Sequence, residues 1–319
     1  YKNFNLFLYL SSYFQYSLRY YLTKYMQKYN FSLVLPLFNE QEIVEITLKE
    51  ILKINLDNDE LFEIIIVNDG SNDLTSTILK KFSLNKNINI ITHDRNYGYG
   101  RALKTGIKNA NTKNIFITDI DGTYPNNKIV DFYNKFSEKK CDMLVGARDA
   151  RSENISLIRK PPKYIINKLA NYLVDYKIPD LNSGFRIFKK ELFEKFENIL
   201  PDGFSFTSTI TLALLSDYKF VAYEKINYEK RVGKSKIHPI KDTINFVVLI
   251  LKVIIYFNPL RVFIPLSIIT FLIGFILILL RIIIGGQFLV TSIIFIFFAT
   301  NFLFLGLIAD LINKKTRRQ

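Results

Sequence analysis

Two carboxylates separated by one residue, Asp119 and Asp121, are the side chains of this sequence best suited to chemistry. They follow an apolar run, residues 114–118, that is typical of a buried strand. Side chains two residues apart on an extended segment point the same way, so both carboxylates can reach one ion. Mg²⁺ and Mn²⁺ take oxygen ligands and typically use one or two carboxylates together with substrate phosphates. The spacing indicates a metal site, although an isolated pair of this kind more often caps a helix or lies in a solvated turn.

The elements that would position this pair are strands that alternate with helices. Strand-like apolar runs occur at residues 31–37, 63–68, 89–92, 114–119 and 142–146. This alternation predicts an α/β fold with a mostly parallel, doubly wound sheet. Polar breaks follow the strands at residues 38–40, 67–71, 96–100 and 119–122. In a parallel sheet such turns meet at one edge, so we expect them to form one site.

The combined turns suit a nucleotide better than any single one does. Carboxylates accept hydrogen bonds from base and ribose, glycines let the backbone approach phosphate, and a metal neutralises a diphosphate. Two other nucleotide-binding classes are excluded. The turn after the first strand lacks the glycines of a dinucleotide fold, and no G-x-x-x-x-G-K-[ST] motif occurs anywhere in the chain.

In order along the chain, these motifs resemble those of the family 2 glycosyltransferases with a GT-A fold. Within that family they are similar to the polyprenyl-phosphate enzymes of the dolichyl-phosphate mannose synthase type. The matching motifs are LPLFNE (35–40), VNDGS (67–71), DRNYGYGRALKTG (94–106), DIDGTYP (119–125), GAR (146–148), LIRK (157–160), DLNSGFR (180–186) and RVGKSK (231–236). The likeness covers roughly residues 31–257.

The resemblance implies a role for individual residues. Nucleotide binding is implied for Pro36, Phe38, Glu40, Asp69, Arg95, Gly98 and Asp119. Mg²⁺ or Mn²⁺ would be held by Asp119, Asp121 and Thr123, although Thr123 stands where Gln is common in the family. Acceptor-phosphate binding is implied for Arg148, Arg159, Arg231, Ser235 and Lys236, and catalysis for Asp121 and the three arginines. An arginine presents a planar fork of donors that suits phosphate, whereas each arginine alone would more often be a solvated or lipid-facing charge.

The lack of a carboxylate that could act as a general base bears on the chemical class of the acceptor. Residues 203–209 contain no carboxylate, at the place where many family members that act on sugar hydroxyls have one. A hydroxyl nucleophile needs a base, whereas a phosphate monoester is already ionised near neutrality, with a second pKa of about 6. His93 and His238, the only histidines, lack a ligand spacing and are expected to be structural. The chain has no Trp, so it lacks the Q-x-x-R-W motif of processive polysaccharide synthases.

We therefore expect inverting transfer of a sugar from a UDP- or GDP-linked donor to a polyprenyl phosphate, either dolichyl or undecaprenyl phosphate. Two alternatives stay open. One is a glycosyltransferase that uses a lipid or glycan hydroxyl as acceptor. The other is a non-enzymatic membrane scaffold with a decayed nucleotide fold.

Two long uncharged stretches, residues 262–280 and 288–309, predict a transmembrane hairpin. At about 1.5 Å per residue, each spans roughly 28 Å or more, close to the ~30 Å hydrocarbon core. A soluble core helix of this length would show a polar face. Basic residues flank the outer ends of both stretches, at Lys252, Arg261, Lys314 and Lys315. The positive-inside rule then predicts that both termini and the catalytic domain are cytoplasmic, at the plasma membrane in a prokaryote.

Four parts are expected along the chain. Residues 1–30 form a basic, aromatic segment that suits an interfacial helix or a helix packed on the domain or on another subunit. Residues 31–236 form the GT-A domain, 237–258 an amphipathic interface helix, and 259–319 the hairpin, with spans at about 262–284 and 288–310 and a basic tail. The net charge of +14 fits anionic lipid headgroups, and no nucleic-acid motif occurs. The single Cys141 excludes an internal disulfide, and a homo-oligomer is left open.

Overall fold

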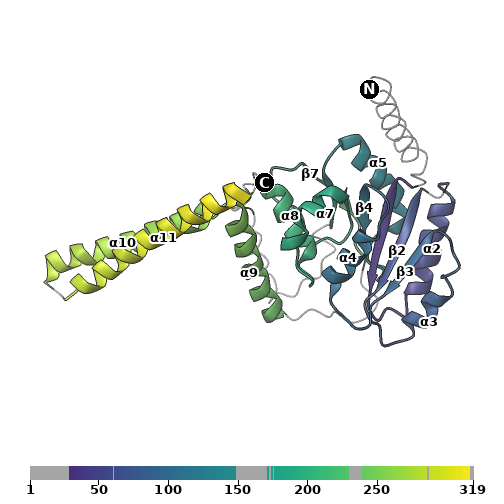
Figure 1. Cartoon of the computed structure of the whole chain (residues 1–319), viewed down its shortest axis with the longest axis horizontal. Helices are drawn as coiled ribbons and strands as arrows, with labels where there is room; N and C mark the ends of the chain where they lie inside the picture. The colour runs from purple at the N-terminus through teal and green to yellow at the C-terminus, as the bar shows by residue number, and fades with distance from the viewer. Residues whose placement is uncertain are drawn as a thin grey trace, which may run out of the picture. The chain divides into compact units, whose positions relative to one another are not determined.

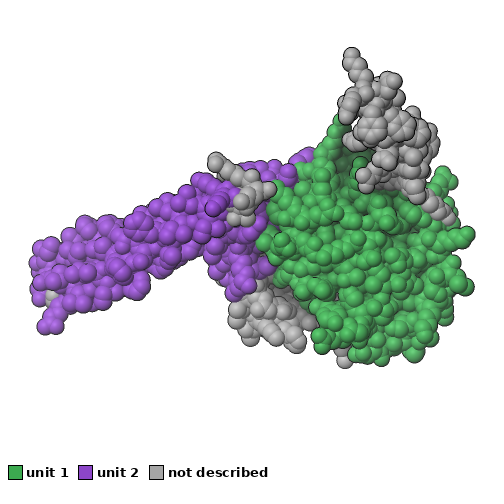
Figure 2. Space-filling view, viewed as in Figure 1, with its two compact units in different colours: residues 1–153, 183–206, 222–234 green, residues 154–182, 207–221, 235–319 purple. Residues whose placement is uncertain are grey.

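The computed structural model of the chain describes residues 29–59, 61–148, 171, 174, 176–229, 239–285 and 287–316. The chain divides into two compact units, which Figure 2 shows in different colours. The first unit comprises Tyr1–Glu153, Ser183–Phe206 and Ala222–Lys234, and the second comprises Asn154–Asn182, Thr207–Val221 and Ser235–Gln319.

A seven-stranded sheet in the order β3-β2-β1-β4-β6-β5-β7 forms the centre of the first unit (Figure 1). Its strands are β1 Phe31–Leu37, β2 Phe62–Asn68, β3 Ile88–Thr92, β4 Asn114–Ile117, β5 Met143–Arg148, β6 Arg186–Lys189 and β7 Val221–Ile226. Strands β1 to β4 pair in parallel, whereas β6 pairs antiparallel with both β4 and β5. The predicted mostly parallel α/β sheet is confirmed. Strand β6, which separates β4 from β5, was not among the predicted strands.

Helices alternate with the parallel strands as expected. They are α2 Val44–Leu56, α3 Thr75–Lys80, α4 Tyr99–Lys108 and α5 Ile129–Lys139, followed later by α7 Lys190–Phe196 and α8 Phe206–Ser216. Helix α4 buries Ala102, Leu103 and Ile107 on one face. Gly106 lets this helix approach the sheet closely, because a Cβ there would lie 2.4 Å from Cγ1 of Val34. The last turns of α4 thereby pack directly on β1 and β2.

Aromatic rings fill much of the core of the first unit. Phe31 at the start of β1 stacks on Phe62, with ring centroids 4.9 Å apart. Phe185, immediately before β6, meets Phe116 and Phe132 edge to face, each at 4.9 Å. Fully burying one such ring contributes about 1.5–3 kcal/mol. Phe185 therefore helps to hold the antiparallel strand β6 against β4.

Three long helices belong to the second unit: α9 Pro239–Phe257, α10 Leu260–Ile284 and α11 Leu289–Thr316. Small residues bring α10 and α11 together, since a Cβ on Gly274 would lie 2.9 Å from Cγ1 of Ile296. The Ser267 hydroxyl also donates to the Ala299 carbonyl at 2.8 Å. Both α10 and α11 are long and apolar enough to cross a membrane. The expected helix in residues 1–28 lies outside the described residues, and the four domain boundaries stay predictions.

Candidate active site

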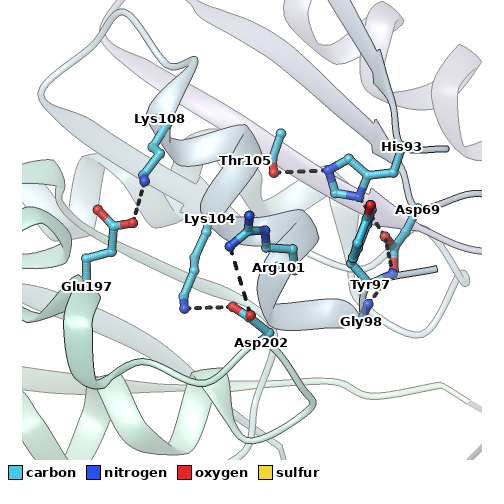
Figure 3. Close-up of polar contacts among 10 residues, drawn as sticks. All are labelled: Asp69, His93, Tyr97, Gly98, Arg101, Lys104, Thr105, Lys108, Glu197 and Asp202. Carbon is cyan, nitrogen blue, oxygen red and sulfur yellow. Dashed lines mark hydrogen bonds and ion pairs between the residues drawn. The ribbon is translucent and has the colours of Figure 1, made fainter. Parts of the chain in front are cut away.

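The buried carboxylate of Asp69, at the end of β2, organises the turn that precedes α4. Its Oδ1 accepts a hydrogen bond from the backbone N–H of Tyr97 at 3.0 Å, and its Oδ2 accepts from that of Gly98 at 2.8 Å. Nδ1 of His93 lies 2.7 Å from Oδ1, and Nε2 of the same ring lies 3.0 Å from the Thr105 hydroxyl (Figure 3). Asp69 therefore shapes the turn that contains Gly98, and His93 lies between Asp69 and Thr105.

The turns after β1 and β2 are tied to each other by backbone-to-side-chain hydrogen bonds. The N–H of Asn39 donates to the Ser71 hydroxyl at 3.0 Å, and the N–H of Glu40 donates to the Thr75 hydroxyl at 3.0 Å. Gly70 has a φ of 68°, and a Cβ there would lie 2.3 Å from the carbonyl carbon of Arg95. These contacts join three successive turns into one continuous edge. The predicted nucleotide-binding residues of this edge, Pro36, Phe38, Glu40, Asp69, Arg95 and Gly98, all lie at or beside the carboxyl ends of β1 to β3.

Asp121 is 7% exposed and is oriented by Thr123. The Thr123 hydroxyl donates to Oδ1 of Asp121 at 2.6 Å, and the Thr123 backbone N–H donates to the same oxygen at 3.2 Å. The Thr123 carbonyl in turn accepts from the N–H of Glu229 at 3.0 Å. The segment after β7 is thereby attached to the turn that carries the carboxylates. Thr123 holds Asp121 in place, and its direct ligation of a metal stays a prediction.

Asp119 has a defined neighbour on each carboxylate oxygen. The hydroxyl of Tyr99, the first residue of α4, donates to Oδ1 at 2.9 Å. Oδ2 faces the backbone of Gly184, where an added Cβ would lie only 2.8 Å away. Burial, together with the Asp119 charge, raises the pKa of Tyr99 well above its usual value. The hydroxyl therefore stays protonated and acts as a donor to the carboxylate.

Tyr124 connects Asp119 with Arg148. Its hydroxyl accepts from the N–H of Gly184 at 2.7 Å, and its ring meets that of Tyr228 at 5.3 Å. The Arg148 guanidinium lies over the Tyr228 ring, 5.2 Å from the centroid. Burial raises the pKa of Tyr124, the Asp119 carboxylate raises it further, and Arg148 opposes this shift. Gly184, Tyr124 and Tyr228 thus connect Asp119 with Arg148 through a series of direct contacts.

The roles of some residues differ from those expected from the sequence or were not predicted. Arg186 is fully buried, and its Nε donates to the Ser183 carbonyl at 2.9 Å, so it braces the turn before β6. Only its place in the DLNSGFR motif could have drawn attention to it. Nothing local in the sequence signals the role of Tyr99. The predicted acceptor residues Arg159, Arg231, Ser235 and Lys236 lie outside the described residues, as does His238.

The donor set at this edge fits a hard divalent ion. Among the residues that the structure describes, no group of three or more His, Cys, Asp or Glu side chains could hold a metal. The pair formed by Asp119 and Asp121 supplies carboxylate oxygens only. Mg²⁺ and Mn²⁺ are bound in this way where substrate phosphates and waters complete the coordination. The site therefore suits an ion that binds together with a nucleotide diphosphate.

Comparison with protein families identifies two segments of the chain. Residues 32–196, more than half of the sequence, match the model described as Glycosyl transferase family 2. The chain belongs to this glycosyltransferase family. Residues 258–314 match the model described as the GtrB C-terminal hairpin. Together with the length and composition of α10 and α11, this match identifies a membrane protein.

Relatives of this family member include bacterial and phage proteins. The uncharacterized glycosyltransferase YkcC of Bacillus subtilis is 24% identical over 212 residues, covering 66% of this chain and 64% of the relative. The dodecaprenyl-phosphate galacturonate synthase of Rhizobium johnstonii is 26% identical, covering 53% and 51%. The bactoprenol glucosyl transferase of Shigella phage SfV is 28% identical, covering 64% and 66%. The chain thus spans less than two thirds of the length of each of these relatives.

Solved structures support the fold of this family member. Glucosyl-3-phosphoglycerate synthase from Mycobacterium tuberculosis, in complex with Mn²⁺, UDP-glucose and phosphoglyceric acid, has a TM-score of 0.54. The two proteins are 14% identical, and the match covers 71% of this chain and 80% of the other. At this identity the likeness concerns the fold alone, and it confirms the expected GT-A architecture.

Proposed function

We propose that the chain transfers a sugar, with inversion, from a nucleoside-diphosphate sugar to a polyprenyl phosphate. The observation that carries this proposal is a series of contacts that runs from Asp119 through Gly184, Tyr124 and Tyr228 to Arg148. A donor diphosphate requires a cation beside carboxylates, and an acceptor phosphate requires a cationic side chain. The site offers a carboxylate, Asp119, and a cationic side chain, Arg148, which are connected through Tyr124. The names of the relatives, bactoprenol glucosyl transferase and dodecaprenyl-phosphate galacturonate synthase, support a lipid phosphate as the acceptor.

In this mechanism, Asp119 and Asp121 would hold Mg²⁺ or Mn²⁺. When bound, the ion would supply the positive charge that stabilises the departing nucleoside diphosphate. Tyr99 and Thr123 orient the two carboxylates through their hydroxyls. Pro36, Phe38, Glu40, Asp69, Arg95 and Gly98 would form the nucleotide edge, which takes a UDP- or GDP-linked sugar.

The acceptor side would orient the nucleophile. Arg148, held over the face of Tyr228, would present its guanidinium to the acceptor phosphate. The same role stays a prediction from the sequence for Arg159, Arg231, Ser235 and Lys236. A phosphate oxygen then attacks the anomeric carbon, and the bond to the diphosphate breaks on the opposite side. No base is required, because the monoester is already ionised near neutral pH. The absence of a carboxylate at residues 203–209 agrees with this requirement.

The orientation in the membrane follows from the charge distribution. Basic residues lie at the outer ends of the hairpin, Arg261 in the first turn of α10 and Lys314 and Lys315 in the last turn of α11, and they favour the cytoplasmic side. We therefore propose that the site faces the cytoplasm, where nucleotide sugars are made available to the lipid acceptor.

The test is a donor and acceptor panel with the full chain in detergent. UDP- and GDP-linked sugars would be supplied with a short polyprenyl phosphate or with diacylglycerol, in the presence of Mg²⁺ or Mn²⁺, and products identified by mass and anomeric configuration. We expect one glycosyl residue on the polyprenyl phosphate, with inverted configuration. Product on diacylglycerol alone would instead support a hydroxyl acceptor, and calorimetry without metal-dependent nucleotide binding would support a scaffold.

Arg148 can be tested in the same assay. Arg148→Gln should lower turnover by about 10²–10³-fold, the range found when one group that stabilises charge in a transition state is removed. Lys139→Gln is the matched control, because Lys139 pairs with Glu224 on the surface at 3.0 Å. Equal activity of the Arg148 variant and the control would contradict the assigned role.

A further inference from the structure

Tyr99 contacts one of the two carboxylates that the proposed reaction assigns to the metal. Its hydroxyl donates to Oδ1 of Asp119 at 2.9 Å, across two different segments of the chain. Its ring stacks on Phe204, with centroids 5.8 Å apart and ring planes within 10° of parallel. Phe204 itself is 59% exposed. The partly exposed Phe204 ring thus packs against the Tyr99 ring, whose hydroxyl contacts Asp119.

The segment that carries Phe204 is docked on the start of α4. The backbone N–H of Arg101 donates to the Asp202 carbonyl at 2.9 Å, and Nζ of Lys104 lies 2.7 Å from a carboxylate oxygen of Asp202 (Figure 3). An exposed ion pair contributes little by itself. The backbone contact is closer: a Cβ at Gly100 would lie 2.2 Å from the Pro201 carbonyl oxygen. Glycine at position 100 therefore permits the approach that places Phe204 over Tyr99.

The opposite side of Asp119 is also closed. Gly184 faces Oδ2, and a Cβ there would lie 3.2 Å from the carboxylate carbon and 2.8 Å from the oxygen. A carboxylate rotates broadly about its terminal torsion when nothing holds it. With Gly184 beside Oδ2, the Tyr99 hydroxyl donates to Oδ1 and thereby favours one orientation of the carboxylate. Groups that orient metal-binding carboxylates in this way typically change metal affinity or activity by 10–100-fold.

We propose that Tyr99 is a positioning residue that sets the affinity of the Asp119–Asp121 pair for its divalent ion, and that Phe204 supports it by stacking. This inference rests on the proposed metal-dependent function. Tyr99 would act only on the orientation of the Asp119 carboxylate, and it is assigned no contact with the donor sugar or the acceptor lipid. It predicts that loss of the Tyr99 hydroxyl weakens metal binding more than it slows turnover at saturating metal.

The experiment measures Mn²⁺ binding separately from sugar transfer. Free Mn²⁺ would be followed by electron paramagnetic resonance during titration of the full chain in detergent, with UDP or GDP present. For Tyr99→Phe we expect the Kd for Mn²⁺ to rise by about 10–100-fold. The kcat at saturating Mn²⁺ should stay within about threefold of the wild-type value, because the ion is then bound to the same carboxylates.

Two further variants test the supporting ring. Phe204→Leu keeps an apolar side chain but loses the stack, and it should raise the Kd in the same direction by a smaller factor. Phe204→Tyr keeps the stack and should restore the wild-type Kd. Tyr133→Phe is the matched control, because the Tyr133 ring stacks on Phe31 at the start of β1 and should leave Mn²⁺ binding unchanged.

The outcomes separate this inference from the proposed function. If wild-type protein transfers sugar with Mn²⁺ but Tyr99→Phe binds Mn²⁺ as tightly as wild type, the inference is wrong and the function stands. If wild-type protein binds nucleotide and Mn²⁺ without any transfer to polyprenyl phosphate, the proposed function is wrong, and the Kd ratio still decides the role of Tyr99. Thermal unfolding of each variant identifies any that fail to fold, and Phe204→Leu then provides the deciding ratio.

Discussion

Carboxylates are buried at both ends of the parallel strands, but the hydrogen bonds that they accept differ between the two ends. Glu63, 8% exposed at the start of β2, accepts from the backbone N–H of Asn111 at 2.7 Å and from its side-chain amide at 2.9 Å. The Ser32 hydroxyl also contacts Glu63. Asp121 at the opposite edge is 7% exposed, and the Thr123 side chain and backbone both donate to a single oxygen, Oδ1.

The difference lies in the donors and not in the burial. Donors reach both oxygens of Glu63 and fasten the segment before β4 to the starts of β1 and β2, so this carboxylate serves the fold. At the other edge, the Tyr99 hydroxyl donates to Asp119, and the Thr123 hydroxyl and backbone N–H donate to Asp121. Burial alone therefore does not distinguish a structural carboxylate from one that binds a ligand. What the donors connect is the better criterion: Glu63 joins the starts of two strands to a third segment, whereas the donors to Asp121 come from its own turn.

The largest effect should come from Asp121→Asn. The amide keeps the shape of the side chain but loses the charge that a divalent ion requires, so sugar transfer should fall by about 10²–10³-fold or more. The thermal midpoint should stay close to wild type, because the Thr123 hydroxyl still has an acceptor. Near-normal turnover at saturating Mn²⁺ would show that Asp121, like Glu63, is not needed for the reaction.

The next effect should come from Gly184→Ala. The new methyl carbon would lie 2.8 Å from Oδ2 of Asp119, so the carboxylate or the turn must move. We expect turnover at limiting metal to fall by about 10–100-fold. Gly203→Ala is the matched control, because a Cβ there meets nothing within 4 Å. Equal kinetics for the two variants would show that the position of Asp119 tolerates displacement.

Glu63→Gln should show the opposite pattern. The amide cannot accept on both sides, so the side chain of the exposed residue Asn111 exchanges its acceptor for water, at a cost of about 0.5–1.5 kcal/mol in the free energy of unfolding. Turnover per folded molecule should be unchanged, since the change lies at the other edge of the sheet. Urea unfolding and active-site titration measure the two quantities, and a loss of turnover without a loss of stability would contradict the comparison.

The smallest effect concerns Cys141, which precedes β5 at the same edge as Glu63. Burial raises the pKa of its thiol to about 11. At pH 8 the reactive thiolate is then scarce, and the native protein should not react measurably with a thiol reagent over minutes. In denaturant the thiol ionises near its ordinary pKa of about 8.5, so one equivalent should react quickly. Rapid labelling of the native protein would show that this edge opens.

The sequence predicts local features of this molecule better than distant contacts. The apolar runs at residues 31–37 and 114–119 correspond closely to β1 and β4, because strand periodicity and polar breaks are local signals. They also place Asp119 and Asp121 at the strand end. The contacts of Asp119 with Tyr99 and Gly184 join separate segments, so no local pattern could reveal them.

Arg186 shows a second limit. An arginine within a motif next to phosphate-binding candidates would be expected at the surface, where most arginines lie. The structure buries it completely and uses it to brace the Ser183 carbonyl. The four-residue strand that begins there is too short to give a periodic pattern, and its antiparallel pairing depends on the tertiary core that Phe185 helps to form.

Strand β6 has a consequence for how the molecule folds. It follows β5 in the chain but lies between β4 and β5, so neither can complete its pairing until β6 has entered the sheet. The pairs among β1, β2 and β3 join strands that are close in sequence, whereas β4 with β6 closes a much longer loop, which costs more chain entropy. We therefore expect the nucleotide edge to form early in refolding. The ability to bind Mn²⁺ should return last, with the arrival of Gly184 beside Asp119.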